Sequence, residues 1–394
     1  MKKKLWLITF LSVVLTAPIY AQQNEAGNGS LGDNGTAASQ RKTNKIDIKD
    51  HFILDSSDDG KERQFPFIYK FGKNIFVSYC EHIDKVVASP TDAMVISRDN
   101  GKSWTEKLRN NDFYISSMFK KAGVLYGIVY FTYPVSSTEE RMIYWTSVNN
   151  GKTWSKKEGM VKAPDGKHFK PGGMNSIWGS MLFHRGMKVM KDGSIQGVMY
   201  GYFDGDPSYS SVWVKSTDNC ATWEIVSTIA KGIPEGEPAK AEGYCEPNFA
   251  ITRDGSILCV MRIGSYLPLY QSRSRDNGLT WSTPVVLPGL SGKSLQSVYP
   301  QLLLMKNGVL ALTYGRPGTR IAFSTDGCGY NWDYAKETYE GETTGYSGIV
   351  ESKPGRLLLV SDQGRTGDKA LAIWGSFIDV NLKPTSIAGI KTKK

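Results

Sequence analysis

The stretch Ser97–Trp104 reads SRDNGKSW, and nearly the same eight residues, SRDNGLTW, return at Ser274–Trp281. In such a stretch the aspartate accepts hydrogen bonds from turn amides, and Asn and Gly tolerate left-handed backbone angles. The closing tryptophan can pack the turn onto a sheet. The pattern therefore predicts a β-hairpin turn that the chain uses more than once.

This motif, called the tryptophan box below, occurs five times. The other copies are SVNNGKTW, STDNCATW and the longer STDGCGYNW, at Ser147–Trp154, Ser216–Trp223 and Ser324–Trp332. Successive boxes begin 50, 69, 58 and 50 residues apart. Recurrence at a nearly regular spacing indicates a repeat architecture built from blade-like units.

A second repeat lies between the boxes and consists of a glycine turn followed by an apolar strand. Its six copies are at Gly72, Gly123, Gly193, Gly255, Gly308 and Gly355. Each unit then contains a strand, a glycine turn, a strand, a loop, a strand, a box and a strand. Six such units predict an all-β fold, a six-bladed β-propeller of four-stranded antiparallel blades over residues 46–394. The last unit has no box, and we expect the chain ends to close the ring there.

The N-terminus has the features of a cleavable signal peptide over residues 1–21. Three lysines precede an apolar run from Leu5 to Leu15, and small residues lead to a cleavage site after Ala21. The run is too short to span a membrane, so no stable membrane insertion is expected. Residues 22–45 are rich in Gly, Asn and Ser and predict a flexible tether. These features predict a periplasmic or secreted protein.

The composition limits the ligand class. The formal charge is +10, and removal of the three leader lysines lowers it to +7, a mild excess that favours acidic ligands. No Lys/Arg block suggests nucleic acid. The five cysteines and four histidines have no metal-ligand or disulfide spacing, so we expect neither a metal nor another cofactor.

Strand parity places the chemistry on the face opposite the glycine turns and boxes. The residues nine positions before each glycine should begin the inner strands: Arg63, Tyr114, His184, Glu246, Tyr299 and Tyr346. Strand ends that merely face water would carry Ser, Lys, Asn or Thr instead. Seven residues after the glycine, three units have tyrosine (Tyr79, Tyr130 and Tyr200), whereas the fourth has Arg262 and the fifth has Arg316 one residue later.

These residue types fit one reaction class. Arg63, Arg262 and Arg316 could converge on one carboxylate, because guanidinium groups form bidentate pairs with planar anions. Glu246 could take the proton of Tyr346 and so activate the phenol as a nucleophile. The general acid is expected in the loop CEHIDKVVASPTD, where we favour Asp84 over Asp92; Glu81 stands at the loop entry.

With these residues in view, the chain resembles the sialidase (neuraminidase) superfamily with bacterial Asp-box repeats, over about residues 55–380. The segments CEPNFAITRDGSILCVMR, YGRPGTRIAFSTDG and TGYSGIV are similar to the family's Glu-to-Arg, third-arginine and nucleophile-tyrosine segments. The resemblance implies Tyr346 as nucleophile, Glu246 as its base, and Arg63, Arg262 and Arg316 as carboxylate ligands. It also implies an acid/base aspartate in the first unit. Sialidases depart from the usual glycosidase carboxylate pair by using tyrosine.

The sequence leaves three functions open. The first is an exo-α-sialidase-like glycoside hydrolase that releases a terminal acidic sugar, sialic acid, from a glycan partner with retention. The second keeps the fold but acts on another glycan, which is favoured by Arg63-Gln64-Phe65-Pro66, one residue longer than the family's Arg-Ile-Pro. The third is an inert propeller that binds glycans or protein.

Overall fold

The computed structural model describes residues 45–56, 61–82, 91–171, 173, 177–364 and 372–386, which all belong to one compact unit, 43–394. The predicted signal peptide, nearly all of the predicted tether and Asp84 lie outside the described residues. Within the described ranges, no helix is both long enough and apolar enough to cross a membrane.

The described chain is all-β, with one short 3₁₀ turn, η1 at Leu290–Gly292. Three sheets are four-stranded meanders in which each strand pairs antiparallel with the next. The first contains β3 Gln64–Phe71, β4 Asn74–Cys80, β5 Thr91–Ser97 and β6 Glu106–Asn111. The second contains β16 Cys245–Ile251, β17 Ile257–Arg262, β18 Tyr270–Ser274 and β19 Val285–Val286. The third contains β20 Val298–Leu304, β21 Leu310–Gly315, β22 Thr319–Ser324 and β23 Tyr334–Tyr339.

The second and third predicted units join into one nine-stranded sheet rather than two separate ones. Its strands are β7 Ile115–Lys121, β8 Val124–Pro134, β9 Glu139–Ser147, β10 Ser155–Lys162, β11 Met181–Phe183, β12 Lys188–Val189, β13 Ile195–Gly201, β14 Ser210–Ser216 and β15 Thr222–Ala230. Strand β10 pairs in parallel with β15, and β11 also pairs with β8, so seven of these strands form a closed ring. Gly159 permits the approach of β10 to β15, because a Cβ there would lie 2.2 Å from the Cys220 carbonyl oxygen. The pairing of β10 with β15 gives hydrogen-bond partners to strand edges that would otherwise be unpaired.

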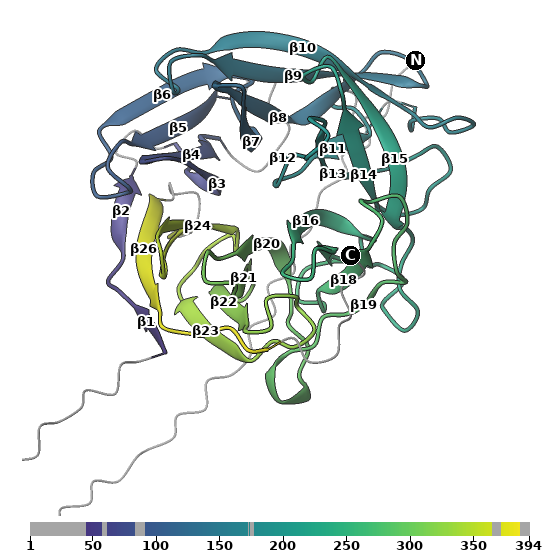
Figure 1. The fold of residues 1–394 in the computed structure, drawn as a ribbon. Helices are drawn as coiled ribbons and strands as arrows, with labels where there is room; N and C mark the ends of the chain where they lie inside the picture. Colours follow the sequence, from purple (N-terminus) through teal and green to yellow (C-terminus); the bar gives the residue numbers. More distant parts are fainter. Residues whose placement is uncertain are drawn as a thin grey trace, which may run out of the picture. The chain divides into compact units, whose positions relative to one another are not determined.

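The last sheet joins the two ends of the described chain, as the sequence predicted. It contains β24 Ser347–Lys353, β25 Arg356–Gln363 and β26 Ala372–Val380, and the early strands β1 Ile46–Ile48 and β2 Phe52–Asp55 both pair antiparallel with β26. Figure 1 shows the strand groups standing around a common centre, with β3, β7, β16, β20 and β24 on the inner side. The arrangement is β-propeller-like.

The hydrophobic core lies between neighbouring sheets. Val77 and Val95 of the first sheet, for example, pack with Leu358, Val360 and Ile373 of the last. Each of these side chains is nearly or fully removed from solvent, and full burial of one such side chain stabilises the fold by about 1.5–3 kcal/mol. Packing between sheets therefore holds the inner strands, and whatever their ends carry, in fixed positions.

The five tryptophan boxes share a serine and an Asp or Asn that accept turn amides, and in three of the boxes the indole also donates to the turn. In the first box, Ser97 Oγ accepts the Gly101 amide at 2.8 Å, and Asp99 Oδ1 accepts the amides of Lys102 and Ser103, each at 3.0 Å. The Trp104 indole donates to the Gly101 carbonyl at 3.2 Å. Equivalent serine and Asp or Asn acceptors serve the other boxes. Every box connects the third strand of its unit to the fourth, the position that the repeat pattern predicted.

Candidate active site

Three inner strands begin with the same irregularity, and it brings functional side chains to one place. The pairings of β3 with β4, β16 with β17 and β20 with β21 each carry a β-bulge at the strand start. The bulged residues Phe65, Glu246 and Tyr299 have φ of 59°, 46° and 56°, and a proline follows each of them. A left-handed non-glycine residue costs of order 1 kcal/mol, and such strain tends to gather at functional sites. Proline suits the bulge because it has no amide to leave unpaired.

The bulges correct the alignment of units that the glycine spacing predicted. Gln64, Cys245 and Val298 occupy the same ladder position, so Phe65, not Arg63, is the counterpart of Glu246 and Tyr299. The glycine turns differ in length: β3 and β4 are joined by two residues and β16 and β17 by five. Counting back from the glycine therefore lands on different ladder positions. The proline after each bulged residue is the sequence signal that aligns the strands correctly.

Tyr346, Glu246 and Arg262 form a directly hydrogen-bonded group. The Tyr346 hydroxyl donates to Glu246 Oε1, and Arg262 Nη1 donates to the same oxygen at 2.7 Å. Arg262 Nη1 also lies 3.3 Å from the Tyr346 hydroxyl oxygen. The second oxygen of Glu246 accepts the Tyr299 amide at 3.0 Å. Glu246 is thus held as a proton acceptor beside the phenol, with a guanidinium facing both.

Arg316 reaches the same group through Ser265. Arg316 Nη1 donates to Ser265 Oγ at 2.7 Å, and Arg262 Nη2 donates to that oxygen at 3.2 Å. The Arg316 guanidinium lies 5.6 Å from the centre of the Tyr346 ring. The residues Tyr346, Glu246, Arg262, Arg316 and Ser265 are called the Tyr346 cluster below. Ser265 was not expected from the sequence, because it lies in a loop without a motif.

A second carboxylate, Glu242, is paired with Arg262. Its Oε1 accepts from Arg262 Nη2 at 2.5 Å, and 39% of the Glu242 side chain is exposed. The Glu242 backbone is anchored by bonds from its amide to Ile263 and from Tyr209 to its carbonyl. The outer face of Arg262 therefore already carries an anion of the chain itself. The sequence analysis did not single out this residue.

The electrostatics of the cluster keep the phenol protonated. Burial raises the pKa of Tyr346 well above its usual value, and the neighbouring charge of Glu246 raises that pKa further. The charges of Arg262 and Arg316 act in the opposite direction on the Tyr346 pKa. Since a neutral phenol is a weak nucleophile, proton transfer to Glu246 has to accompany any attack.

Aromatic rings and a buried arginine enclose Tyr346. Its ring lies 3.9 Å from that of Tyr299 and 4.7 Å from that of Phe65, centre to centre. The Arg185 guanidinium is 3.9 Å from the centre of the Tyr299 ring, and it donates to the Ser347 carbonyl at 2.7 Å. Of the predicted strand starts, Tyr114 and His184 join the same aromatic group through Phe67 and Tyr299. Tyr114 and His184 therefore lie in one aromatic group with Tyr299 and Tyr346, whereas Arg63 does not.

Arg63 belongs to a different cluster. Its Nε donates to Asp55 Oδ2 at 2.6 Å and lies 3.3 Å from Glu81 Oε1, with 2% of the side chain exposed. Lys107 binds the same two acids, and Arg109 binds Glu81. The structure thus brings Arg262 and Arg316 together at Tyr346, whereas the ion pairs of Arg63 with described side chains run to Asp55 and Glu81. Its role as a substrate ligand stays a prediction.

The three candidates for the general acid differ in their surroundings. Asp84 lies outside the described residues. Asp92 is 1% exposed, accepts the Phe113 amide at 3.2 Å, and has a pKa that burial raises to about 7. Glu81 is engaged by Arg109, Lys107 and Arg63, which together hold its pKa below the usual value against the effect of burial. Asp92 is enclosed and Glu81 is saturated, so Asp84 stays the favoured prediction.

Comparison with known proteins identifies the family. The BNR repeat-like domain matches residues 124–359, more than half of the chain, and the protein belongs to this family. No curated protein matches. The family places the chain in the sialidase/BNR superfamily that the boxes predicted.

Several solved structures share the fold. A Dyadobacter fermentans protein of unknown function aligns with a TM-score of 0.62 at 16% identity, over 85% of this chain and 99% of that one. The Hadza microbial sialidase Hz136 aligns with a TM-score of 0.60 at 16% identity, over 83% of this chain and 68% of that one. The Trypanosoma rangeli sialidase aligns with a TM-score of 0.54 at 15% identity, over 80% of this chain and 55% of that one. At these identities the likeness establishes a sialidase-like fold.

Proposed function

We propose that the protein is a retaining glycoside hydrolase of the sialidase type, built as a six-bladed propeller, that releases a terminal acidic sugar from glycans. The observation that carries this proposal is the shared oxygen of Glu246, which accepts hydrogen bonds from both Tyr346 and Arg262. The likeness of fold to the Trypanosoma rangeli sialidase supports it, since that protein has been solved with sialic acid and as a covalent intermediate. Sialic acid is therefore the first substrate to test.

In the proposed first step, the Tyr346 oxygen attacks the anomeric carbon while its proton passes to Glu246. Arg262 Nη1 faces both the phenol oxygen and Glu246, so it stabilises negative charge as it develops on either. The bond between the anomeric carbon and the leaving oxygen breaks, and that oxygen takes a proton from a general acid. We assign the general acid to Asp84. A neutral phenol suits this substrate, because a carboxylate nucleophile would repel the carboxylate at the anomeric carbon.

In the second step, the oxygen of a water molecule attacks the anomeric carbon, the bond from that carbon to the Tyr346 oxygen breaks, and the same aspartate, now a base, takes a proton from the water. Glu246 returns its proton to the Tyr346 oxygen as that bond breaks. Two displacements at one carbon give net retention. Arg262 and Arg316 are the proposed ligands of the sugar carboxylate, because they meet on the single oxygen of Ser265 beside the nucleophile.

One observation favours the alternative substrate class, a glycan without a carboxylate at this position. Glu242 already occupies Nη2 of Arg262 and balances its charge together with Glu246. An acidic sugar would have to displace Glu242 or share the arginine with it, whereas a neutral sugar would not. We therefore keep a neutral glycan as the second candidate. The predicted leader would take either enzyme to the periplasm or the medium.

The first experiment compares the chain lacking residues 1–21 with its Tyr346→Phe variant on a fluorogenic sialoside. Tyr299→Phe is a matched control, since its ring lies 3.9 Å from that of Tyr346 but it reaches Glu246 through its backbone amide. Release by the wild type and by Tyr299→Phe, with loss in Tyr346→Phe, is the expected result. No release by the wild type would sink the sialidase proposal, and cleavage of a fluorogenic neutral glycoside tested in parallel would support the second candidate.

A further inference from the structure

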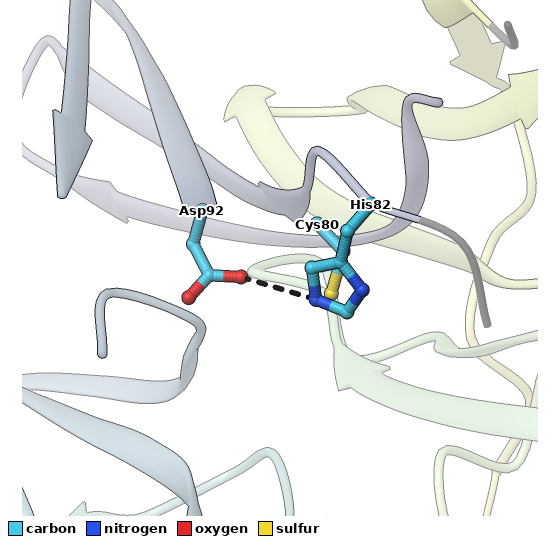
Figure 2. Close-up of side chains that lie close together, drawn as sticks. All are labelled: Cys80, His82 and Asp92. Atoms are coloured by element: carbon cyan, nitrogen blue, oxygen red, sulfur yellow. Dashed lines mark ion pairs between the residues drawn. The ribbon is translucent and has the colours of Figure 1, made fainter. Parts of the chain in front are cut away.

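Three side chains with metal-binding atoms lie close together where β4 ends and β5 begins. Cys80 is the last residue of β4, and Asp92, the second residue of β5, is its direct partner in the antiparallel ladder. Directly opposed residues in a ladder project from the same face. His82 follows Cys80 by two residues and turns its ring toward them, as Figure 2 shows. The sequence separations of 2 and 10 residues match no common metal motif, which is why the sequence predicted no metal site.

The three groups are nearly close enough to share one ion. One atom of each, the Cys80 sulfur, a His82 ring nitrogen and an Asp92 carboxylate oxygen, lies within 4.8 Å of the others. His82 Nε2 is 3.8 Å from Asp92 Oδ1. Bond lengths of about 2.3 Å to sulfur and about 2.0–2.2 Å to nitrogen or oxygen place ligand atoms of a tetrahedral zinc ion roughly 3.3–3.8 Å apart. A contraction of about 1 Å along the longest separation would therefore seat the ion.

Burial of these side chains favours the binding of a cation. Cys80 is 3% exposed and Asp92 is 1% exposed. One oxygen of Asp92 accepts the Phe113 amide at 3.2 Å, whereas Oδ1 faces the Cys80 and His82 side chains. Burying a carboxylate costs free energy because its charge loses the solvation of water, and coordination to a cation offsets that cost.

The donor set selects the class of ion. A thiolate sulfur and an imidazole nitrogen favour zinc and similar divalent transition metals, whereas magnesium and calcium take oxygen ligands. We propose that Cys80, His82 and Asp92 form a binding site for one divalent ion of the zinc type. Three protein ligands leave one coordination position for water or another donor. The ion would tie the end of β4 to the start of β5.

Zinc binding to the folded chain tests this proposal. The chain lacking residues 1–21, without a histidine tag, is stripped with a chelator and titrated with Zn²⁺ against a chromophoric competitor, and bound metal is counted by mass spectrometry. Co²⁺ serves as a second probe, because a cobalt–thiolate bond gives a charge-transfer band in the near ultraviolet. The variants are Cys80→Ser and His82→Gln. Cys259→Ser is the matched control, since Cys259 is also buried and outside any disulfide but lies on β17 among apolar side chains.

The expected result is one zinc per chain for the wild type and Cys259→Ser, with affinity at least tenfold weaker in Cys80→Ser and His82→Gln. The cobalt–thiolate charge-transfer band should disappear in Cys80→Ser. Every other folded variant that binds cobalt should keep the band. If Cys80→Ser does not fold, the partly exposed His82 provides the deciding variant. Wild type that binds no stoichiometric zinc, or a folded His82→Gln that binds it as tightly, would overturn the proposal.

Discussion

Two clusters of arginines and carboxylates flank the start of β3, and they use the same residue types for different ends. In the Tyr346 cluster, Arg262 and Arg316 meet on Ser265 beside a half-buried phenol. In the second, called the Arg63 cluster, Arg63, Lys107 and Arg109 are bonded to Asp55 and Glu81. The first cluster holds the phenol that we propose as nucleophile, whereas the second saturates its carboxylates with cations. Arginine identity alone therefore does not define a ligand site; the partners that surround the guanidinium do.

Asp362 connects the start of β3 with the segment that precedes Tyr346. Asp362 is fully buried; its carboxylate accepts the Phe65 amide at 3.0 Å and the Thr344 amide at 2.8 Å. It thus ties the bulge of β3 to the segment that carries Tyr346. Because Phe65 takes the bulged position, Arg63 is carried two residues away from the position of Glu246. The register of this strand start therefore places Arg63 outside the Tyr346 cluster.

The largest effect is expected from removing the base in the Tyr346 cluster. Glu246→Gln keeps the shape but cannot take the phenol proton, so kcat on a cleaved substrate should fall by about 10²- to 10⁴-fold. Steady-state kinetics with urea unfolding as a parallel measurement checks this. A kcat within a factor of about 3 of the wild type, in a folded variant, would remove Glu246 from the chemistry.

The next effect is expected in the Arg63 cluster and should appear in stability. Arg63→Met leaves two buried or half-buried acids short of a cation, and removing one partner of a buried pair costs about 3 kcal/mol of unfolding free energy. We expect KM to change little. The sequence-based assignment of Arg63 to the substrate carboxylate predicts the reverse, a raised KM with ordinary stability. Urea unfolding and KM measured on one preparation decide between them.

A smaller effect is expected from the anion that occupies Arg262. Glu242→Gln removes its charge while keeping its size, so an acidic sugar should bind more tightly by about 1 kcal/mol, or about fivefold in affinity. Neutral sugars should be unaffected. Inhibition constants for an acidic and a neutral sugar provide the measurement. Equal changes for both would mean that Glu242 does not select substrates by charge.

The smallest effect concerns pH. Burial raises the pKa of Asp362, and hydrogen bonds from Thr343, Thr344 and Phe65 offset only part of that rise. The folded state then holds this proton to higher pH than the unfolded state, so the unfolding free energy should fall as pH rises from about 4 toward the raised pKa. Asp362→Asn should lose this part of the slope. Chemical unfolding at several pH values measures it, and identical slopes in both proteins would refute the expectation.

Much of this protein could be predicted from its sequence because the signals are local and repeated. The boxes Ser97–Trp104 and Ser274–Trp281 close their hydrogen bonds within eight residues, so a turn and its neighbouring strands follow from the letters. Recurrence then implied an all-β architecture with joined ends, and β26 does pair with β1 and β2. Glu246 and Arg262 were singled out because sister units carry tyrosine at these repeat positions, whereas Tyr346 was singled out as a phenolic strand start and by the resemblance to the family.

Only the tertiary structure decided where the side chains point and which partners they contact. The position of a bulge depends on how two strands pair, and the pairing of β3 with β4 places Phe65, rather than Arg63, against Tyr346. Glu242 and Ser265 reach Arg262 from loop positions without a motif. The meeting of Cys80, His82 and Asp92 likewise depends on cross-strand register. Local hydrogen bonding determines the turns and strands, but the partner of each charge depends on residues distant in sequence, which only the packed sheets bring together.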